Sequence, residues 1–115
     1  MSVKLRPTPF DISQPSANYQ PGDWFYSSHG DRPCPYWDNC DGRHVWVVLP
    51  GGDLWNSHWR ASNCTMKEDR LHRCWVLHGL WPDVTADKNG LTCAAGAGSI
   101  VGTSFHGFLR NGVLA

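Results

Sequence analysis

The stretch His44-Val45-Trp46-Val47-Val48-Leu49 decides the fold class of this 115-residue chain. Its β-branched and aromatic residues favour an extended strand that is partly buried. The Pro-Gly-Gly triplet at residues 50–52 follows at once and is typical of a turn. The sequence therefore predicts a central β-strand that ends before Pro50.

Shorter stretches of the same kind lie on both sides of this strand. The candidates are residues 24–27, 74–78, 99–101 and 105–109, and the Asn111-Gly112 pair before Val113 is typical of a hairpin turn. Only residues 63–73 suggest a helix, because Thr65-Met-Lys-Glu68 fits a capping box. We predict a mainly β fold, a small antiparallel sheet or a partial barrel.

The length of the chain fits one domain, which at this size buries about two thirds of the surface of the unfolded chain. Aliphatic residues are sparse, but seven tryptophans can serve either a small core or an interface. Four prolines in residues 1–22 favour extended backbone there. We therefore predict an extended N-terminal arm over residues 1–22 and a β-rich, zinc-binding domain over residues 23–115.

The charge and hydropathy of the chain exclude several classes of partner. The formal net charge is zero and there is no run of Lys or Arg, so no nucleic-acid partner is expected. No apolar stretch approaches the ~18 to 20 residues that span a bilayer, and the N-terminus lacks the apolar region of a signal peptide. We expect neither membrane insertion nor secretion by a signal peptide.

Five cysteines cannot all pair within one chain, and without a signal peptide they are expected to be reduced. Two disulfides and one thiol remain the alternative if the protein sits in an extracellular particle. Cys34 and Cys40 flank a Pro/Asp/Asn-containing loop, and two close thiolates are what one side of a tetrahedral zinc site needs. The other ligands would come from His44, Cys93 or His106.

The C-terminal segments Thr92–Ile100 and Ser104–Leu114, taken with the Cys34–Leu49 region, resemble a group of small phage and prophage proteins. Their pattern has a Cys-Pro knuckle, a Ser-Ile step, and a Cys and His before an aromatic strand that ends in Asn/Asp-Gly. This chain departs from the pattern at Thr103 and Ser104, so Cys93 would have to replace the family's cysteine. With the resemblance, the predicted zinc ligands are Cys34, Cys40, Cys93 and His106, with His44 in reserve.

A second group of candidate ligands comprises Cys64 and Cys74, with His58, His72 and His78 nearby. Within it, Cys64, Cys74 and His78 could hold a second zinc ion. The polar segment between the two cysteines gives no clear ligand geometry, so we expect two reduced thiols here rather than a second zinc site. His29 and His58 are expected to be solvated loop residues. Residues 94–99 are rich in Gly and Ala but lack the Lys-Ser/Thr of a phosphate-binding loop, which predicts a connector.

The segment Trp75-Val-Leu-His-Gly-Leu-Trp-Pro-Asp83 resembles the first active-site element of the acid ribonucleases that include the plant self-incompatibility enzymes. The resemblance implies that His78 would act as a general acid or base in RNA cleavage. The family's second element, His-Glu-x-x-Lys-His-Gly, has no match, because Glu68 is the only glutamate and precedes His78. We therefore expect a strand followed by a Gly/Pro turn.

No catalytic set assembles, so the sequence favours a non-enzymatic structural or interaction protein. The phage resemblance implies a virion component, such as a capsid decoration or cement protein, present in several copies. Its partners would be other capsid proteins, contacted through the N-terminal arm and exposed tryptophans, in the virion or the host cytoplasm. The alternatives are a ribonuclease-like enzyme that uses His78 and a small zinc-binding regulator of a host protein.

Overall fold

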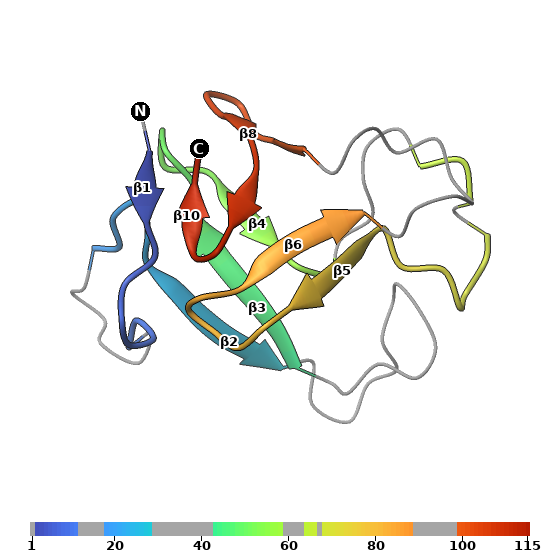
Figure 1. The fold of residues 1–115 in the computed structure, drawn as a ribbon, viewed down its shortest axis with the longest axis horizontal. Helices are drawn as coiled ribbons and strands as arrows, with labels where there is room; N and C mark the ends of the chain where they lie inside the picture. The colour runs from blue at the N-terminus through green and yellow to red at the C-terminus, as the bar shows by residue number, and fades with distance from the viewer. Residues whose placement is uncertain (1, 12–17, 29–42, 59–63, 67, 89–98) are drawn as a thin grey trace.

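A computed structural model describes residues 2–11, 18–28, 43–58, 64–66, 68–88 and 99–115. Within these ranges the secondary structure consists of strands and turns (Figure 1). The strands are β1 (Val3–Lys4), β2 (Trp24–Ser28), β3 (Arg43–Val48), β4 (Leu54–Asn56), β5 (Trp75–His78), β6 (Thr85–Lys88), β7 (Ile100–Val101), β8 (His106–Gly107), β9 (Leu109–Arg110) and β10 (Val113–Leu114). The mainly β prediction is confirmed.

The predicted central strand is the middle strand of a three-stranded antiparallel sheet with the order β2-β3-β4. Trp24, Val47 and Trp55 lie opposite one another across its strands, and all three side chains are buried. Because side chains alternate between the faces of a strand, Phe25 and Trp46 lie on the other face, where their rings stack with centroids 6.4 Å apart. The alternation in β3 therefore directs one row of large side chains into the core.

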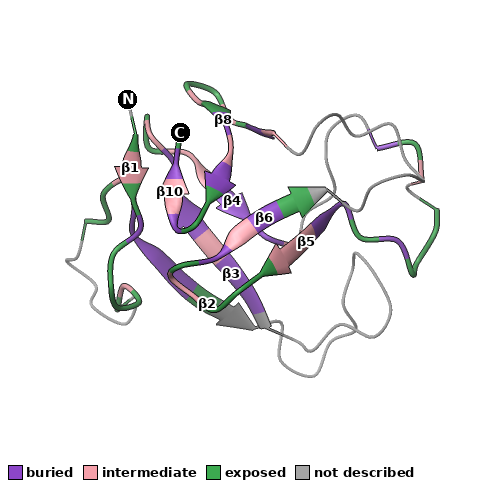
Figure 2. Ribbon diagram, viewed as in Figure 1, coloured by how far each residue is buried: buried purple, intermediate pink, exposed green. Residues whose placement is uncertain are grey.

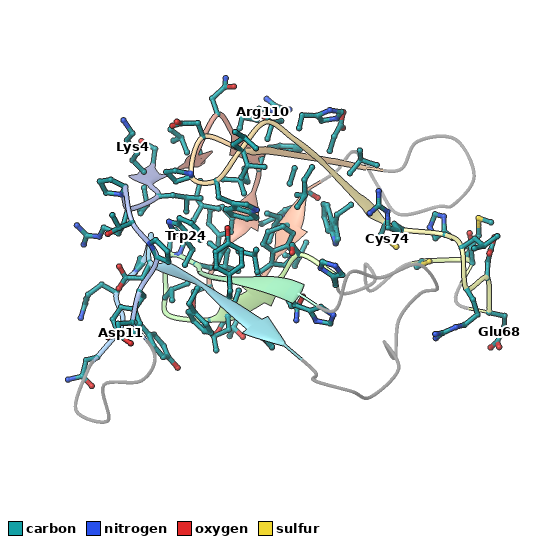
Figure 3. All side chains as sticks on the ribbon, turned by 90° about the horizontal axis from the view of Figure 1, so that it is seen from below. Lys4, Asp11, Trp24, Glu68, Cys74 and Arg110 are labelled. Carbon is teal, nitrogen blue, oxygen red and sulfur yellow. The ribbon has the colours of Figure 1, made fainter. Side chains whose placement is uncertain are left out.

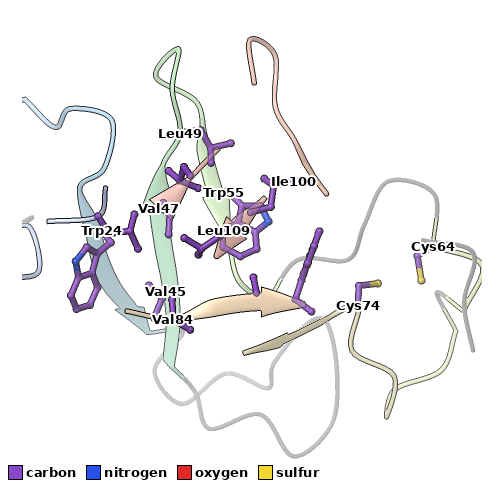
Figure 4. Close-up of a cluster of buried hydrophobic side chains, with 14 residues drawn as sticks. Trp24, Val45, Val47, Leu49, Trp55, Cys64, Cys74, Val84, Ile100 and Leu109 are labelled. Carbon is purple, nitrogen blue, oxygen red and sulfur yellow. The ribbon is translucent and has the colours of Figure 1, made fainter. Parts of the chain in front are cut away.

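A second antiparallel sheet, β1-β10-β9, closes the other side of the core (Figure 2). Leu114 pairs with Leu109, and both are completely buried, whereas Lys4 and Arg110 are exposed. Figure 4 shows Val47, Trp55, Ile100 and Leu109 gathered in one cluster. These two sheets supply much of the core, and Trp75, Val84, Ala86 and Ile100 from other segments complete it.

The N-terminal segment is attached to the domain over residues 3–10. β1 pairs with β10, Leu5 is 2% exposed, and the backbone N–H of Phe10 donates to the carbonyl of Trp24. The indole N–H of Trp24 donates to the carbonyl oxygen of Arg6 at 2.8 Å. These contacts attach residues 3–10 to the domain, with Val3 and Lys4 in the sheet and Leu5 in the core.

β5 and β6 form a separate two-stranded ribbon, with Trp75 opposite Lys88 and His78 opposite Thr85. The sequence predicted β5 but missed β6, whose residues Thr85-Ala-Asp-Lys88 are not β-branched or aromatic except at Thr85. Ala86 nevertheless faces inward and is 5% exposed, next to the fully buried Val84. β6 is therefore a product of tertiary packing rather than of local propensity.

The predicted helix over residues 63–73 is wrong. Residues 64–66 and 68–73 form turns, in which Asp69 N–H donates to the Met66 carbonyl and His72 N–H donates to the Asp69 carbonyl. A helix would separate Cys64 and His72 by about 12 Å along its axis. The turns instead bring both side chains to one buried cluster, which overrides the local capping signal.

The hairpin turn at Asn111-Gly112 gives a direct test of the packing between β9–β10 and residues 82–85. Gly112 has φ of +78°, and a Cβ there would lie 2.5 Å from the Pro82 carbonyl oxygen. We expect Gly112→Ala to lower the free energy of unfolding by about 3 kcal/mol, through backbone strain and this clash. Gly52→Ala is the control, because Gly52 also has a positive φ of +98° but a Cβ at that position would have no neighbour within 4 Å. If urea denaturation gives the same loss of unfolding free energy for both variants, the clash with Pro82 does not contribute.

Candidate metal centre

Three potential metal ligands meet where the chain between Cys64 and Cys74 turns back on itself. The Sγ atoms of Cys64 and Cys74 and a ring nitrogen of His72 all lie within 4.8 Å of one another. The three residues are 6%, 3% and 4% exposed, respectively. Figure 4 shows Cys64 and Cys74 at the end of the hydrophobic cluster that is farthest from Trp24.

The spacing between the imidazole and one thiol fits a shared metal ion. His72 Nε2 lies 3.6 Å from Cys74 Sγ. Zinc binds sulfur at about 2.3 Å and histidine nitrogen at about 2.0–2.1 Å, so two such ligands at a tetrahedral angle lie about 3.6 Å apart. The geometry therefore allows one zinc-sized ion to bind both groups with little movement.

A backbone donor contacts one of the two sulfurs. The backbone N–H of Met66 donates to Cys64 Sγ at 3.3 Å. The charged residues Glu68, Asp69, Arg70 and Arg73 are exposed, and Figure 3 shows Glu68 directed away from Cys74. The segment thus turns its ligands inward and its charges toward solvent.

The cluster is also joined directly to the core. Cys74 immediately precedes β5, and the next residue, Trp75, packs edge-on against Trp55 with ring centroids 5.5 Å apart. Trp75 is 8% exposed. A metal bound here would therefore fix the start of β5 as well as the turns before it.

Of the four predicted zinc ligands, Cys34, Cys40 and Cys93 lie outside the described residues. The fourth, His106, is exposed on β8, and its Nε2 lies 3.2 Å from Ser99 Oγ. The reserve ligand His44 is buried, and its Nδ1 lies 3.2 Å from Asn56 Nδ2. The predicted site stays a prediction.

In the second group of candidates, Cys64 and Cys74 are reduced, as the sequence predicted. The structure brings them together with His72 rather than with His78. The available signal was the His72-x-Cys74 pair, because residues two apart in an extended or turning backbone can point to the same side. The polar segment after Cys64 gave no sequence signal that Cys64 would lie near His72 and Cys74.

His58 is not a solvated loop residue, as the sequence suggested. It is half-buried, and its ring stacks on that of His44 with centroids 4.2 Å apart and an interplanar angle of 13°. Its Nδ1 lies 3.3 Å from Ser57 Oγ, and its backbone N–H donates to Asn56 Oδ1. This histidine pair belongs to the packing beside β4. His29 lies outside the described residues.

His78, the residue with a ribonuclease counterpart, is at the exposed end of β5. Its Nε2 lies 3.7 Å from Asp87 Oδ2 on β6, and the two side chains are 58% and 62% exposed. The following Gly79 has φ of +88°, which allows the chain to turn into Leu80 and Trp81. Trp81 stacks on Trp24 with ring centroids 5.5 Å apart, so Trp81 of the motif serves packing.

The described tryptophans Trp24, Trp46, Trp55, Trp75 and Trp81 are buried or half-buried. Trp37 and Trp59, the other two of the seven, lie outside the described residues. The large hydrophobic side chains exposed most strongly in the described part are Leu80 at 85%, Leu71 at 69% and Val101 at 65%.

No family model matches the chain, and searches of curated proteins and of solved structures found no match. The ranges covered by the structure contain no helix with the length and apolar character needed to cross a membrane. The cluster of Cys64, His72 and Cys74 is the one group of three or more potential ligands found among the described residues. We identify it as the candidate metal centre.

Proposed function

We propose that Cys64, His72 and Cys74 hold a structural zinc ion and that the protein is a zinc-stabilised interaction module. The observation that carries this proposal is the convergence of three buried ligand atoms within 4.8 Å. Two cysteines and one histidine are a common zinc ligand combination, completed by a fourth ligand from another side chain or from water. The ion would join the turns of residues 64–73 to β5.

The chemistry of the donors and their burial favour zinc over Mg²⁺, Ca²⁺ and Cu⁺. Thiolate and imidazole are soft or borderline ligands, which Mg²⁺ and Ca²⁺ avoid. Two thiolates and a neutral imidazole together with Zn²⁺ carry no net charge, whereas Cu⁺ would leave one negative charge. A buried site favours the neutral assembly, because an uncompensated charge is costly in a low dielectric.

An interaction role is supported by the surface next to the site. Leu71 is 69% exposed on the turn that carries His72, so metal binding would also fix the position of this apolar side chain. The phage-like sequence pattern suggests a virion as the setting, with capsid proteins as partners. In this setting zinc would provide the rigidity that a small core alone gives poorly.

Metal analysis of the purified protein tests the site. We expect about one equivalent of zinc per chain, and less than about a fifth of an equivalent in the double variant Cys64→Ser/Cys74→Ser. His72→Ala should weaken binding so that a competing chelator removes the ion at lower concentration. The matched control is Cys34→Ser/Cys40→Ser, which changes two cysteines of the other predicted site. Retention of a full equivalent in Cys64→Ser/Cys74→Ser would exclude the proposed ligands.

The ribonuclease alternative has its own test, because His78 is accessible on the surface. We expect purified protein to cleave RNA no faster than its His78→Ala variant in a metal-independent assay at acidic pH, since the ion-pair partner of this exposed histidine among the described residues is the carboxylate of Asp87 rather than a second histidine. Asp87→Asn is the control for loss of the ion pair alone. RNA cleavage that disappears in His78→Ala would contradict the non-enzymatic assignment.

A further inference from the structure

We propose that Cys64 and Cys74 are a reversible redox modification site, at which a disulfide forms and displaces the metal ion. This inference rests on the proposed zinc site, which it deepens by assigning its regulation. Both residues are thiols in the structure, and their Sγ atoms lie within 4.8 Å of each other. The same proximity that suits a metal therefore also suits a sulfur–sulfur bond.

The backbone between the two cysteines can accommodate the change. A disulfide has an S–S length of about 2.05 Å, so each sulfur must move by no more than about 1.4 Å. The described residues between the cysteines, 65–66 and 68–73, form turns and bends rather than strands. Cys74 lies just outside β5, so the adjustment does not require the pairing of β5 with β6 to break.

Polar groups of the chain lie beside both sulfurs. Met66 N–H donates to Cys64 Sγ, and His72 Nε2 lies 3.6 Å from Cys74 Sγ. These contacts help to hold the two sulfurs near each other.

The oxidant we propose is hydrogen peroxide. One thiolate attacks a peroxide oxygen, which breaks the O–O bond, forms a sulfenic acid and releases hydroxide. The other thiolate then attacks the sulfenic sulfur, which forms the S–S bond and releases a second hydroxide. With two protons the products are one disulfide and two water molecules, and two electrons have passed from the thiolates to the peroxide. His72 alone cannot retain the ion, which leaves.

The sequence provides a direct readout of this disulfide. Trypsin cuts after Lys67, Arg70 and Arg73, so the two cysteines end in separate peptides, residues 61–67 and 74–88. A Cys64–Cys74 disulfide joins these two peptides, and dithiothreitol separates them. Linkage can therefore be assigned in the full chain even though Cys34, Cys40 and Cys93 are present.

The experiment treats zinc-loaded protein with hydrogen peroxide and follows released zinc with a colorimetric chelator and linkage by mass spectrometry. We expect the joined peptides to appear in step with release of most of the bound zinc, at least about a fivefold loss, and dithiothreitol to restore both. Cys64→Ser and Cys74→Ser should lose the joined peptides, whereas His72→Ala should still form them. A variant with Cys34, Cys40 and Cys93 changed to Ser shows whether Cys64 and Cys74 form the disulfide without the other three cysteines.

The outcomes separate this inference from the proposed function. Zinc that depends on Cys64 and Cys74 but is not released by peroxide, or is released with linkage to other cysteines, would overturn the redox site and leave the zinc site intact. Joined peptides in a protein that binds no zinc would overturn the zinc proposal and support the disulfide. Absence of the joined peptides in both wild type and His72→Ala would exclude the disulfide altogether.

Discussion

Removal of the metal is expected to lower the free energy of unfolding by at least about 3 kcal/mol, a large part of the ~5–15 kcal/mol that stabilises an ordinary domain. The proposed ion would bind the folded arrangement of Cys64, His72 and Cys74, which the unfolded chain does not maintain. Its loss would also release Cys74, which directly precedes Trp75 and its packing against Trp55. Urea denaturation of zinc-loaded and chelator-treated protein at one pH measures the difference.

The control for this experiment is the double variant Cys64→Ser/Cys74→Ser. Its urea midpoint should lie near that of the chelator-treated wild type. Addition of chelator to the double variant should not lower this midpoint further. Identical unfolding midpoints for zinc-loaded and chelator-treated wild type would show that the metal does not contribute to stability. A continued response to chelator in the double variant would place the stabilising ion at other ligands.

The second large effect is expected from Trp24→Ala. Trp24 is 3% exposed, stacks on Trp81 with ring centroids 5.5 Å apart, and donates its indole N–H to the Arg6 carbonyl. Truncation removes a buried aromatic ring, so we expect a loss of about 3–5 kcal/mol in the free energy of unfolding. The N-terminal segment should also become more susceptible to proteolysis, because its hydrogen bond to the core is lost.

Trp24→Phe separates the contribution of ring burial from that of the hydrogen bond to the Arg6 carbonyl. It retains a buried ring but cannot donate the hydrogen bond, so we expect a loss of about 1–2 kcal/mol. Urea denaturation and limited proteolysis of both variants give the measurement. Equal losses for Trp24→Ala and Trp24→Phe would mean that the hydrogen bond, rather than ring burial, holds the N-terminal segment.

The sequence predicted the strands whose local signals agree with their tertiary environment. Residues 44–49 combine β-branched and aromatic side chains with a following turn, and the chain forms β3 there. The Asn111-Gly112 turn was predicted for the same reason, and the structure has positive φ at both residues. β1 and β6 lack such signals, and each exists because a partner strand or a buried neighbour fixes it.

The metal centre was harder to predict because its ligands are brought together by turns. The Thr65–Glu68 pattern is typical of a helix start, and nothing local indicates that burial of Cys64 and His72 overrides it. The sequence prediction was placed on Cys34 and Cys40, two thiols in a turn-rich loop, and these residues lie outside the described part of the structure. His72 was named near Cys64 and Cys74, but the ligand pattern proposed for them used His78, which is exposed.

X-ray absorption spectroscopy of the zinc-loaded protein tests the central claim most directly, because it identifies the atoms bound to the ion. The proposed site predicts at least two sulfur atoms at about 2.3 Å and at least one nitrogen at about 2.0–2.1 Å. In Cys64→Ser the sulfur contribution should fall, and in Cys34→Ser it should stay unchanged. An unchanged sulfur shell in both Cys64→Ser and Cys74→Ser, or a shell of oxygen and nitrogen alone in the wild type, would contradict a zinc ion held by Cys64, His72 and Cys74.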